Sequence, residues 1–446
     1  MNQIAVGDPT AGFTVVEGQS IAPPFKHAAS FFTFSPDPWV TERLEIHLAG
    51  TPSQISAGIT GLETSILRAQ DYRRAAYPSP QYLRFQPVSG GEYFYTPFSN
   101  AYLESNPAGY KTHQAGSRLV TLHYTRASWF DGQQIELPLT GRSGPDVTGG
   151  FDIFNHTDHH TGHISSLRIK PEYAISELPA PLRIELQSTY APTNIKDIHI
   201  GSYYHPTNTD DNMFFGQSHN MTGGTQNYNI NAIGDYYRRL TWSSTAWSPI
   251  LYYSLNATQT SLLDGRSYQP IILLYNTHTY DDLYLQLRLK RGVDTLYTGD
   301  PIFIDPDYKY ILFPPIEIPP NQLLREVLPH FVELVFYARK VSGASYTLDV
   351  DQVMLLPLDY SASFLGFFPM RENNILVDDS HRQLTNVRYS HIGSETVAHV
   401  RTGSPLMLTP NVHTRLFFLM TNTANQIEMM RTATVKVFYR QRKRFI

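Results

Sequence analysis

The sequence of 446 residues contains no cysteine. This absence excludes disulfides, thiolate metal ligands and cysteine nucleophiles. It does not assign a compartment, because a chain without thiols is stable under oxidising and reducing conditions alike.

Charge is scarce as well. Charged residues make up 17% of the chain, and the formal net charge is -4 at pH 7. Because this balance gives no field strong enough to hold a phosphate backbone, we expect no nucleic-acid partner. One basic run is terminal, "RQRKRF", with Arg440, Arg442, Lys443 and Arg444. It is either a nucleic-acid arm or an exposed end that makes ionic contacts with neighbouring protein, and we favour the exposed end.

Long apolar runs are also missing. No segment approaches the roughly 18 apolar residues of a membrane span, and "MNQIAVGDPTAGF" lacks the basic region and apolar run of a signal peptide. We therefore expect a soluble protein with no cleaved export signal and no membrane insertion. Three Asn-x-Ser/Thr triplets, at Asn155, Asn220 and Asn256, are then chance matches.

Common catalytic motifs are absent too: the sequence has no phosphate loop, no G-x-S-x-G and no H-E-x-x-H. Asp349 and Asp351 in "LDVDQV" form a candidate carboxylate pair for sugar hydrolysis, because alternation would point both to one strand face. The competing interpretation, which we favour, places them on a solvent face opposite Leu348 and Val350. We predict a protein that is not an enzyme and has no catalytic residue, cofactor or metal ion.

Aromatic side chains, in contrast, are abundant, with 29 Tyr and 24 Phe. Exposed aromatics stack on sugar rings, and nearby carboxylates bind hydroxyl groups. The candidates for a glycan-binding face are Trp242, Trp247, Tyr252, Tyr253, Tyr280, Asp281 and Asp282. The alternative is that these residues belong to a core or an interface, where aromatics are more often found.

Histidines are concentrated in "FNHTDHHTGH", which contains His156, His159, His160, His163 and Asp158. His-x-x-His spacing in a loop permits a Zn or Fe site. The interleaved Asn, Thr and Gly residues instead indicate a flexible polar connector at a domain junction, which we favour. Whether assembly brings histidines of neighbouring subunits together stays open.

Alternation with period two dominates the chain and predicts an all-β protein. In "LYLQLRLK" (283–290) the four leucines fall on one face of a strand, and Tyr, Gln, Arg and Lys fall on the other. "ERLEIHL" and "PLRIELQ" repeat this pattern. One segment, 51–73, has helical spacing instead, and its stripe consists of Ile55, Ile59, Leu62, Ile66 and Ala69. Thr51 can cap this helix, with Gln54 completing a capping box.

Composition also suggests boundaries. "GRSGPDVTGG" (141–150) has four glycines and a proline without apolar periodicity, which predicts the end of a first domain. The polar, Gly/Asn-rich stretch 216–237 is interpreted as a long loop or linker.

Several blocks resemble the distal tail proteins of long-tailed bacteriophages and prophages. "WVTERLEIHLAGTPSQISAGITGLETSILRAQDYR", "QYLRFQP" and "SRLVTLHYTRASWF" are similar to their N-terminal domain, and "ISELPAPLRIELQS" with "IKDIHIGSY" to the opening of their second β-domain. "PLMLTPNVHTRLFFLM" and "ATVKVFYRQRKRF" resemble their terminal strands, although Asn411 follows Pro410 where the family often has glycine. The region from "SPILYYSLNATQTSLLDGRSYQPIILLYN" to "LDVDQVMLLPLD" resembles a jelly-roll module of the carbohydrate-binding type.

The resemblance implies a mainly β fold in four segments. These are a ring-forming α+β domain with one main helix (1–145), the first part of a β-sandwich (146–247), an inserted jelly-roll (248–365) and the remainder of the sandwich (366–446). It also implies a structural virion protein, assembled in the host cytoplasm as a homohexameric ring that joins the tail tube protein to the baseplate hub protein. The inserted module would contact host-surface glycan.

Two alternatives to the tail-tip function stay open. One is a polysaccharide-binding or polysaccharide-cleaving β-protein, for which a jelly-roll is equally natural. The other is a different virion role, such as a tube or decoration protein.

Overall fold

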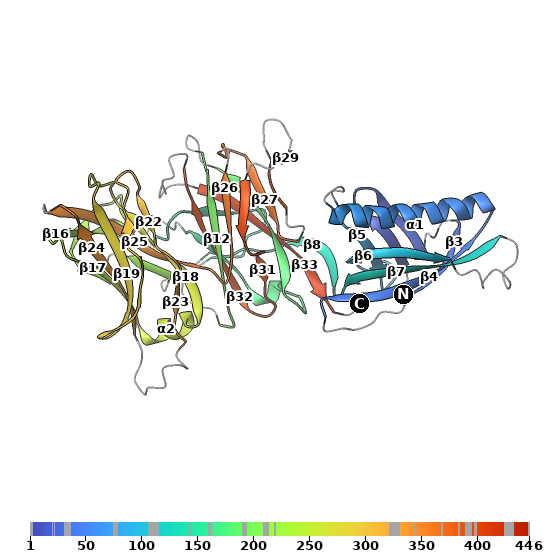
Figure 1. Cartoon of the computed structure of the whole chain (residues 1–446), viewed down its shortest axis with the longest axis horizontal. Coiled ribbons are helices and arrows are strands. Elements are labelled where there is room, and N and C mark those ends of the chain that lie inside the picture. The colour runs from blue at the N-terminus through green and yellow to red at the C-terminus, as the bar shows by residue number, and fades with distance from the viewer. Residues whose placement is uncertain are drawn as a thin grey trace. The chain divides into compact units, whose positions relative to one another are not determined.

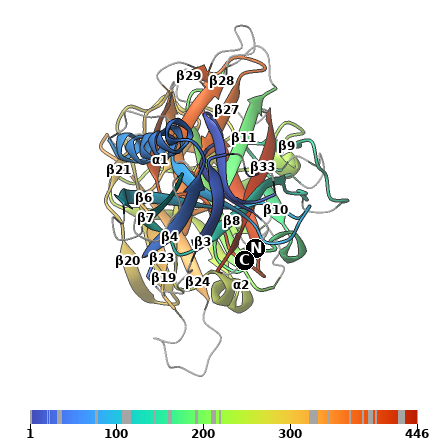
Figure 2. The ribbon, with the colours of Figure 1, turned by 90° about the vertical axis from the view of Figure 1, so that its right-hand side faces the viewer.

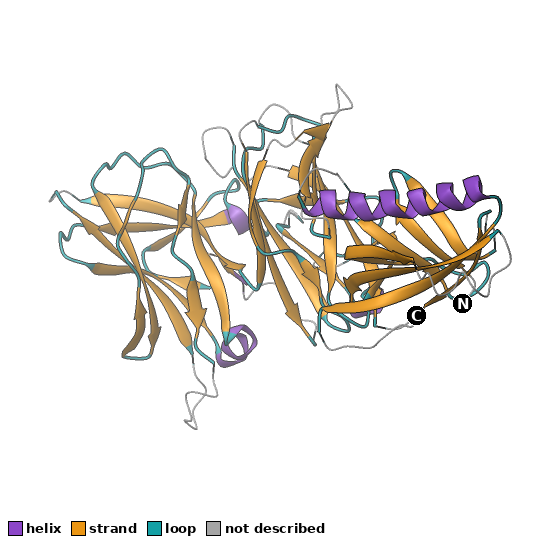
Figure 3. Cartoon of the chain, turned by 45° about the vertical axis from the view of Figure 1, so that its right-hand side comes forward, coloured by secondary structure: helices purple, strands orange, loops and turns teal. Residues whose placement is uncertain are grey.

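The computed structural model describes residues 3–19, 21, 23–30, 37–74, 79–105, 116–141, 144–158, 162, 164–189, 194–207, 214–217, 220–320, 331–342, 345–366, 369–381, 384–388, 395–396, 399–422 and 432–444. Two compact units are present: Met1–Ile135 with Ser176–Ala180 and Arg440–Ile446, and Glu136–Ile175 with Pro181–Tyr439. Strands dominate, as predicted, and Figure 3 shows them in orange beside the purple helices. No helix among the described residues is long and apolar enough to cross a membrane.

The first unit is an antiparallel sheet with one helix lying across it (Figures 1 and 2). The strands follow the order β2-β1-β5-β6-β7-β4-β3, and β8 pairs with β6. Their bounds are β1 Gln3–Asp8, β2 Gly12–Gly18, β3 Phe25–Ser30, β4 Trp39–Ala49, β5 Gln81–Gln86, β6 Phe94–Ser105, β7 Ser117–Ala127 and β8 Phe130–Glu136.

Helix α1 (Pro52–Arg73) begins where the sequence predicts. The Gln54 backbone N–H donates to the Thr51 hydroxyl, and the Thr51 backbone N–H donates to the Gln54 side chain, which completes the capping box. The predicted stripe faces the sheet: Ile55, Leu62, Ile66 and Ala69 are buried, and Ile59 is partly buried. The α+β character predicted for the N-terminal part is confirmed.

The second unit contains a two-sheet sandwich built from residues 151–175, 181–205 and 360–439, which we call the carrier sandwich. One sheet has the order β9-β33-β11-β27-β28-β29 with β31 on β11, and the other has the order β10-β32-β12-β26-β30. The bounds are β9 Phe151–Phe154, β10 Ser166–Ile169, β11 Ala180–Ser188, β12 Ile198–His205, β26 Tyr360–Gly366, β27 Ile375–Asp379, β28 Leu384–Arg388, β29 Glu395–Thr396, β30 His399–Gly403, β31 Met407–Leu408, β32 His413–Met420 and β33 Thr432–Lys443. Asn411, before β32, has φ 59°, a left-handed conformation that asparagine adopts more readily than other residues with a side chain, although less readily than glycine.

A second sandwich, residues 214–357, is inserted between β12 and β26, which are antiparallel neighbours. Its sheets have the orders β15-β16-β25-β18-β22, with β13 and β23 alongside, and β14-β17-β24-β19-β20, with β21 alongside. The bounds are β13 Phe215–Gln217, β14 Met221–Thr222, β15 Thr225–Tyr228, β16 Tyr236–Trp242, β17 Ser248–Leu255, α2 Ala257–Leu263, β18 Arg266–Leu274, β19 Leu283–Arg291, β20 Asp294–Thr298, β21 Ile302–Phe303, β22 Tyr310–Leu312, β23 Ile316–Ile318, β24 Val332–Lys340 and β25 Tyr346–Pro357. From β16 to β19, and again from β23 to β25, the chain alternates between the two sheets, as it does in a jelly-roll. We call it the inserted sandwich.

The inserted sandwich begins earlier than the sequence suggested. The sequence predicts a loop or linker over 216–237, but β13, β14, β15 and the start of β16 lie in this stretch. That interpretation was wrong because these short strands are stabilised by backbone pairing with β17 and β25, and residues of β15 are largely exposed. Polar composition fits such an edge strand as well as it fits a loop.

Candidate functional site

The outward side of one sheet of the inserted sandwich is rich in aromatic and cationic side chains. In that sheet β17, β24 and β19 lie side by side (Figure 1). The leucines of β19 are at most 1% exposed, so its Tyr284, Arg288 and Lys290 point outward, as the alternation predicts. Opposite residues of paired strands share a face, and β24 therefore adds Tyr337 and Arg339 to this side.

Tyr284 and Arg339 form a row across this side of the sheet together with two further side chains, Trp247 and Phe303. The Arg339 guanidinium lies 5.1 Å from the ring of Trp247 on one side and 5.6 Å from the ring of Tyr284 on the other. Phe303 continues the row, with its ring centroid 5.6 Å from that of Tyr284 and 48% of the residue exposed. We call Trp247, Arg339, Tyr284 and Phe303 the aromatic row.

A second line of side chains runs beside the aromatic row. The Arg288 guanidinium lies 3.9 Å from the centroid of the Tyr337 ring, and its Nε and Nη2 donate to the Gln286 side-chain oxygen at 3.0 and 2.9 Å. Lys290 lies 5.6 Å from the same ring. Cation–π contacts of this kind hold cations in fixed places on the surface.

The aromatic row ends at a pocket of about 250 Å³. Phe303 belongs to both, and the pocket is also lined by Ile302, Ile304, Asp305, Tyr308, Tyr310, Ile311 and Leu312. Burial raises the pKa of Tyr310 to about 12, so its hydroxyl keeps its proton and can donate a hydrogen bond at neutral pH. Apolar walls with a few polar groups are typical of small-ligand sites.

Comparisons with known proteins assign the chain to no family. No protein-family model and no curated protein matches it. The tandem CBM22-1–CBM22-2 domain of Xyn10C from Paenibacillus barcinonensis is 10% identical, over 57% of this chain and 99% of that chain, with a TM-score of 0.20. A structure of infectious bursal disease virus, Gt strain, is 9% identical, over 71% of this chain and 82% of that chain, with a TM-score of 0.17.

The aromatic residues predicted from sequence lie in three different places. Trp247 is in the aromatic row and Tyr252 is on the same side of the sheet, since it pairs with Val335, the partner of Arg288. Tyr253 is a core residue, 1% exposed. Trp242 and Tyr280 gather elsewhere, at one end of the sandwich.

This end cluster is held together by internal contacts. The ring of Tyr346 lies 3.7 Å from that of Trp242 and 5.9 Å from that of Tyr280. The Lys340 ammonium is 4.9 Å from the Tyr280 ring and 3.8 Å from Asp282. Because Lys340 is buried and occupies the space between the rings, the contacts of the end cluster are structural. The seventh candidate, Asp281, is exposed.

The predicted carboxylate pair is not on a solvent face. Asp349 accepts two hydrogen bonds from Arg239, both 2.9 Å, and one from Asn276 at 3.1 Å. Asp351 is fully buried, and the Ile233 backbone N–H donates to it. The solvent-face prediction was wrong because the insertion packs both sides of this part of β25. Fixed partners and burial also leave this pair no room for a sugar.

Part of the histidine-rich stretch is buried rather than a flexible connector. Asn155 is fully buried and exchanges two hydrogen bonds of 2.7 Å with the Met420 backbone, and His156 and Asp158 are buried beside it. The Thr157 carbonyl accepts hydrogen bonds from side chains of the inserted sandwich, Gln217 at 2.8 Å and Gln352 at 3.2 Å. His159, His160 and His163 lie outside the described residues. Within the described part, no three His, Asp or Glu side chains are grouped for a metal.

The asparagines of the three Asn-x-Ser/Thr triplets lie in different surroundings. Asn155 is inaccessible, and Asn256 caps α2 with its side chain. Asn220 lies in a turn, where its side chain bonds to the Gln217 backbone N–H and the Phe215 carbonyl.

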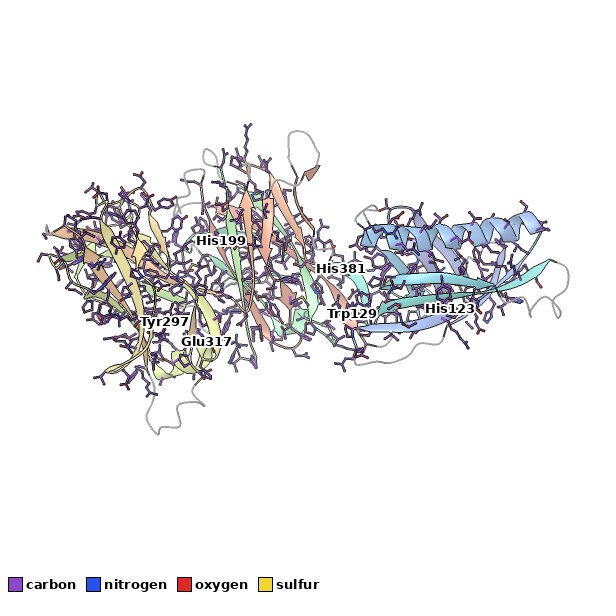
Figure 4. All side chains as sticks on the ribbon, viewed as in Figure 1. His123, Trp129, His199, Tyr297, Glu317 and His381 are labelled. Carbon is purple, nitrogen blue, oxygen red and sulfur yellow. The ribbon has the colours of Figure 1, made fainter. Side chains whose placement is uncertain are left out.

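The terminal basic run is not simply an exposed end. Arg442 donates to both carboxylate oxygens of Asp131, at 2.7 and 3.0 Å, and its guanidinium lies 4.4 Å from the ring of Trp129, which is labelled in Figure 4. The Lys443 ammonium is 4.6 Å from the Phe94 ring. The ionic contacts predicted with neighbouring protein are therefore made, for Arg442, within its own chain.

Proposed function

We propose that the protein is a structural virion component, the distal tail protein of a long-tailed bacteriophage, whose inserted sandwich binds glycan on the host surface. In this role six copies form a ring, assembled in the host cytoplasm, between the tail tube protein and the baseplate hub protein. Support comes from the sequence blocks that resemble this family together with the order of elements: an α+β unit, a carrier sandwich and an inserted sandwich.

The observation that carries the binding role is the aromatic row. The rings of Tyr284 and Phe303 lie on the paired strands β19 and β21, Trp247 directly precedes β17, and the row ends at a pocket. Flat apolar rings next to hydrogen-bonding side chains match the faces and hydroxyl groups of pyranose sugars. Strand pairing fixes the spacing of Tyr284 and Phe303, so these two rings lose little conformational freedom on binding.

The oligomeric state of the purified protein tests the assembly role. We expect the purified protein to form closed rings in negative-stain images, with a mass close to six chains in mass photometry. A stable monomer that releases reducing sugar from polysaccharide would instead favour the alternative, a polysaccharide-cleaving enzyme. Tubes or particles decorated on their outside would favour the other virion roles.

Variants of the aromatic row test the binding role. Trp247→Ala and Tyr284→Ala should each weaken retention on host-wall polysaccharide by about tenfold, because each removes one stacking ring. Tyr228→Ala is the matched control, since Tyr228 is 66% exposed but lies on β15, in the other sheet. Affinity electrophoresis gives the measurement. Equal losses in all three variants would contradict a site at the aromatic row.

A further inference from the structure

We infer that the saccharide bound by the inserted sandwich is anionic, carrying carboxylate or phosphate groups. This inference rests on the proposed glycan-binding function and specifies the chemical class of its ligand. It is carried by three cations on one side of one sheet: Arg339, within the aromatic row, and Arg288 and Lys290, beside it.

These three cations differ from others in the inserted sandwich. Arg239 pairs with Asp349, Arg266 with Asp359, and Lys340 with Asp282. Among the residues that the structure describes, no carboxylate lies within 4.0 Å of the charged nitrogens of Arg288, Lys290 or Arg339. A sheet face that gathers unneutralised cations attracts anions, most strongly at low ionic strength.

The two arginines are also positioned in advance. Arg339 is held between two rings, and its Nε is buried without an acceptor. Arg288 lies on Tyr337 and is anchored through Nε and Nη2 by Gln286, which leaves its Nη1 donors unused by that contact. A planar guanidinium fixed in this way matches the two oxygens of a carboxylate or a phosphate.

The carboxylate nearest these cations in the strand register does not neutralise them. Glu333 faces Lys290 across the β19–β24 pair, but it accepts a hydrogen bond from the Ser254 hydroxyl at 2.7 Å. The positive side of the sheet is therefore continuous from Arg339 to Arg288.

Single-stranded nucleic acid also combines stacking with cations, but it fits this site less well. Backbone recognition needs a groove of cations that tracks many phosphates. Here the cations are few, Glu333 lies opposite Lys290 in the strand register, and the whole chain carries a formal charge of -4.

The test compares matched probes on the full-length protein. We expect carboxymethyl dextran to bind at least about tenfold more tightly than dextran, with the difference shrinking as salt rises. Polygalacturonate and a phosphorylated mannan then distinguish carboxylate from phosphate, and a thymidine oligonucleotide tests nucleic acid. Isothermal titration gives each affinity.

Charge variants locate the effect. Arg339→Gln should lower the ratio of carboxymethyl-dextran affinity to dextran affinity by about tenfold, while Arg339→Lys should lower this ratio less, because it keeps the charge but not the planar stack. Arg371→Gln is the control, since Arg371 is exposed on the carrier sandwich. Should Arg339→Gln fail to fold by circular dichroism, Arg288→Gln replaces it.

The outcomes separate the two claims. Equal affinity for dextran and carboxymethyl dextran would contradict the inference that the ligand is anionic, but it would still support the proposed glycan binding. If the protein binds none of these saccharides, both the inference of an anionic ligand and the proposed glycan binding are wrong. Tighter binding to the oligonucleotide than to any saccharide overturns the inference in favour of nucleic acid.

Discussion

At the scale of single residues, Asp351 has an unusual environment. It is fully buried in β25, and burial raises its pKa to about 7, with a further contribution from the negative charge of Asp158. The Ile233 backbone N–H donates to its carboxyl group and opposes this shift. Because an unfolded aspartate ionises near pH 4, the folded form binds the extra proton, and stability falls as pH rises from about 4 to about 7.

Asp351→Asn should therefore stabilise the protein at high pH only. Asparagine keeps the oxygen that accepts from Ile233 and cannot ionise, so we expect a gain of up to about 4 kcal/mol at pH 8 and almost none at pH 4. Urea unfolding at both pH values measures the difference. Asp349→Asn is the control with the opposite sign, because it loses the ion pair with Arg239. If Asp351→Asn raised the free energy of unfolding equally at both pH values, the protonation of Asp351 would have no role in stability.

Some residues of the aromatic and cationic side of β19 are predictable from the sequence, but their neighbours on other strands are not. Alternation placed Tyr284, Arg288 and Lys290 on one strand face, and "HFVELVFYAR" holds the same signal for Tyr337 and Arg339. What the sequence could not supply is the register that sets Arg339 opposite Tyr284, because pairing between distant strands depends on tertiary contacts. Burial of Asp351 was missed for the same reason.

At the scale of elements, local signals predicted best. The capped helix α1 and the leucine face of β19 depend on spacing within one segment, and both were found. The short strands between 215 and 242 were missed, because their stability comes from partners far away in sequence. Their edge position, with polar side chains, hides them among loops.

Strand β32 belongs to one sandwich and stabilises two. It pairs with β10 and β12 in the carrier sandwich, yet Phe417 and Leu419 are part of the inserted sandwich's core. The Phe417 ring lies 4.6 Å from Phe214. Close approach is needed nearby as well, since a side chain on Gly201 would meet the Pro357 carbonyl at 2.3 Å.

Phe417→Ala should thus loosen a sandwich to which it does not belong in sequence. Removing a fully buried ring costs about 3–5 kcal/mol, and we expect faster hydrogen exchange in β13 and β25. Phe418→Ala, an adjacent and equally buried ring of β32 that is absent from that core, is the matched control and should act first on the carrier sandwich. Unchanged exchange in β13 and β25 for Phe417→Ala would mean that the sandwiches are independent.

At the scale of the whole molecule, the insertion has two covalent attachments. It leaves the carrier sandwich after β12 and returns at β26, and these strands are paired, with Ser202 opposite Tyr360. Side chains of Gln217 and Gln352 add hydrogen bonds to the Thr157 carbonyl. The insertion is therefore tied to its carrier by two chain connections at neighbouring strands and by these two side-chain hydrogen bonds.

The attachment of the insertion at two points matters for avidity, which is the combined strength of several contacts with one polymer. If copies of the chain form a ring, each presents its aromatic row in the same orientation, so a repetitive polymer can engage several rows at once. The second contact is then intramolecular, and the combined strength can exceed a single contact by about 10²–10⁴. Millimolar attraction at each row would suffice for firm attachment, while any one contact could still release quickly.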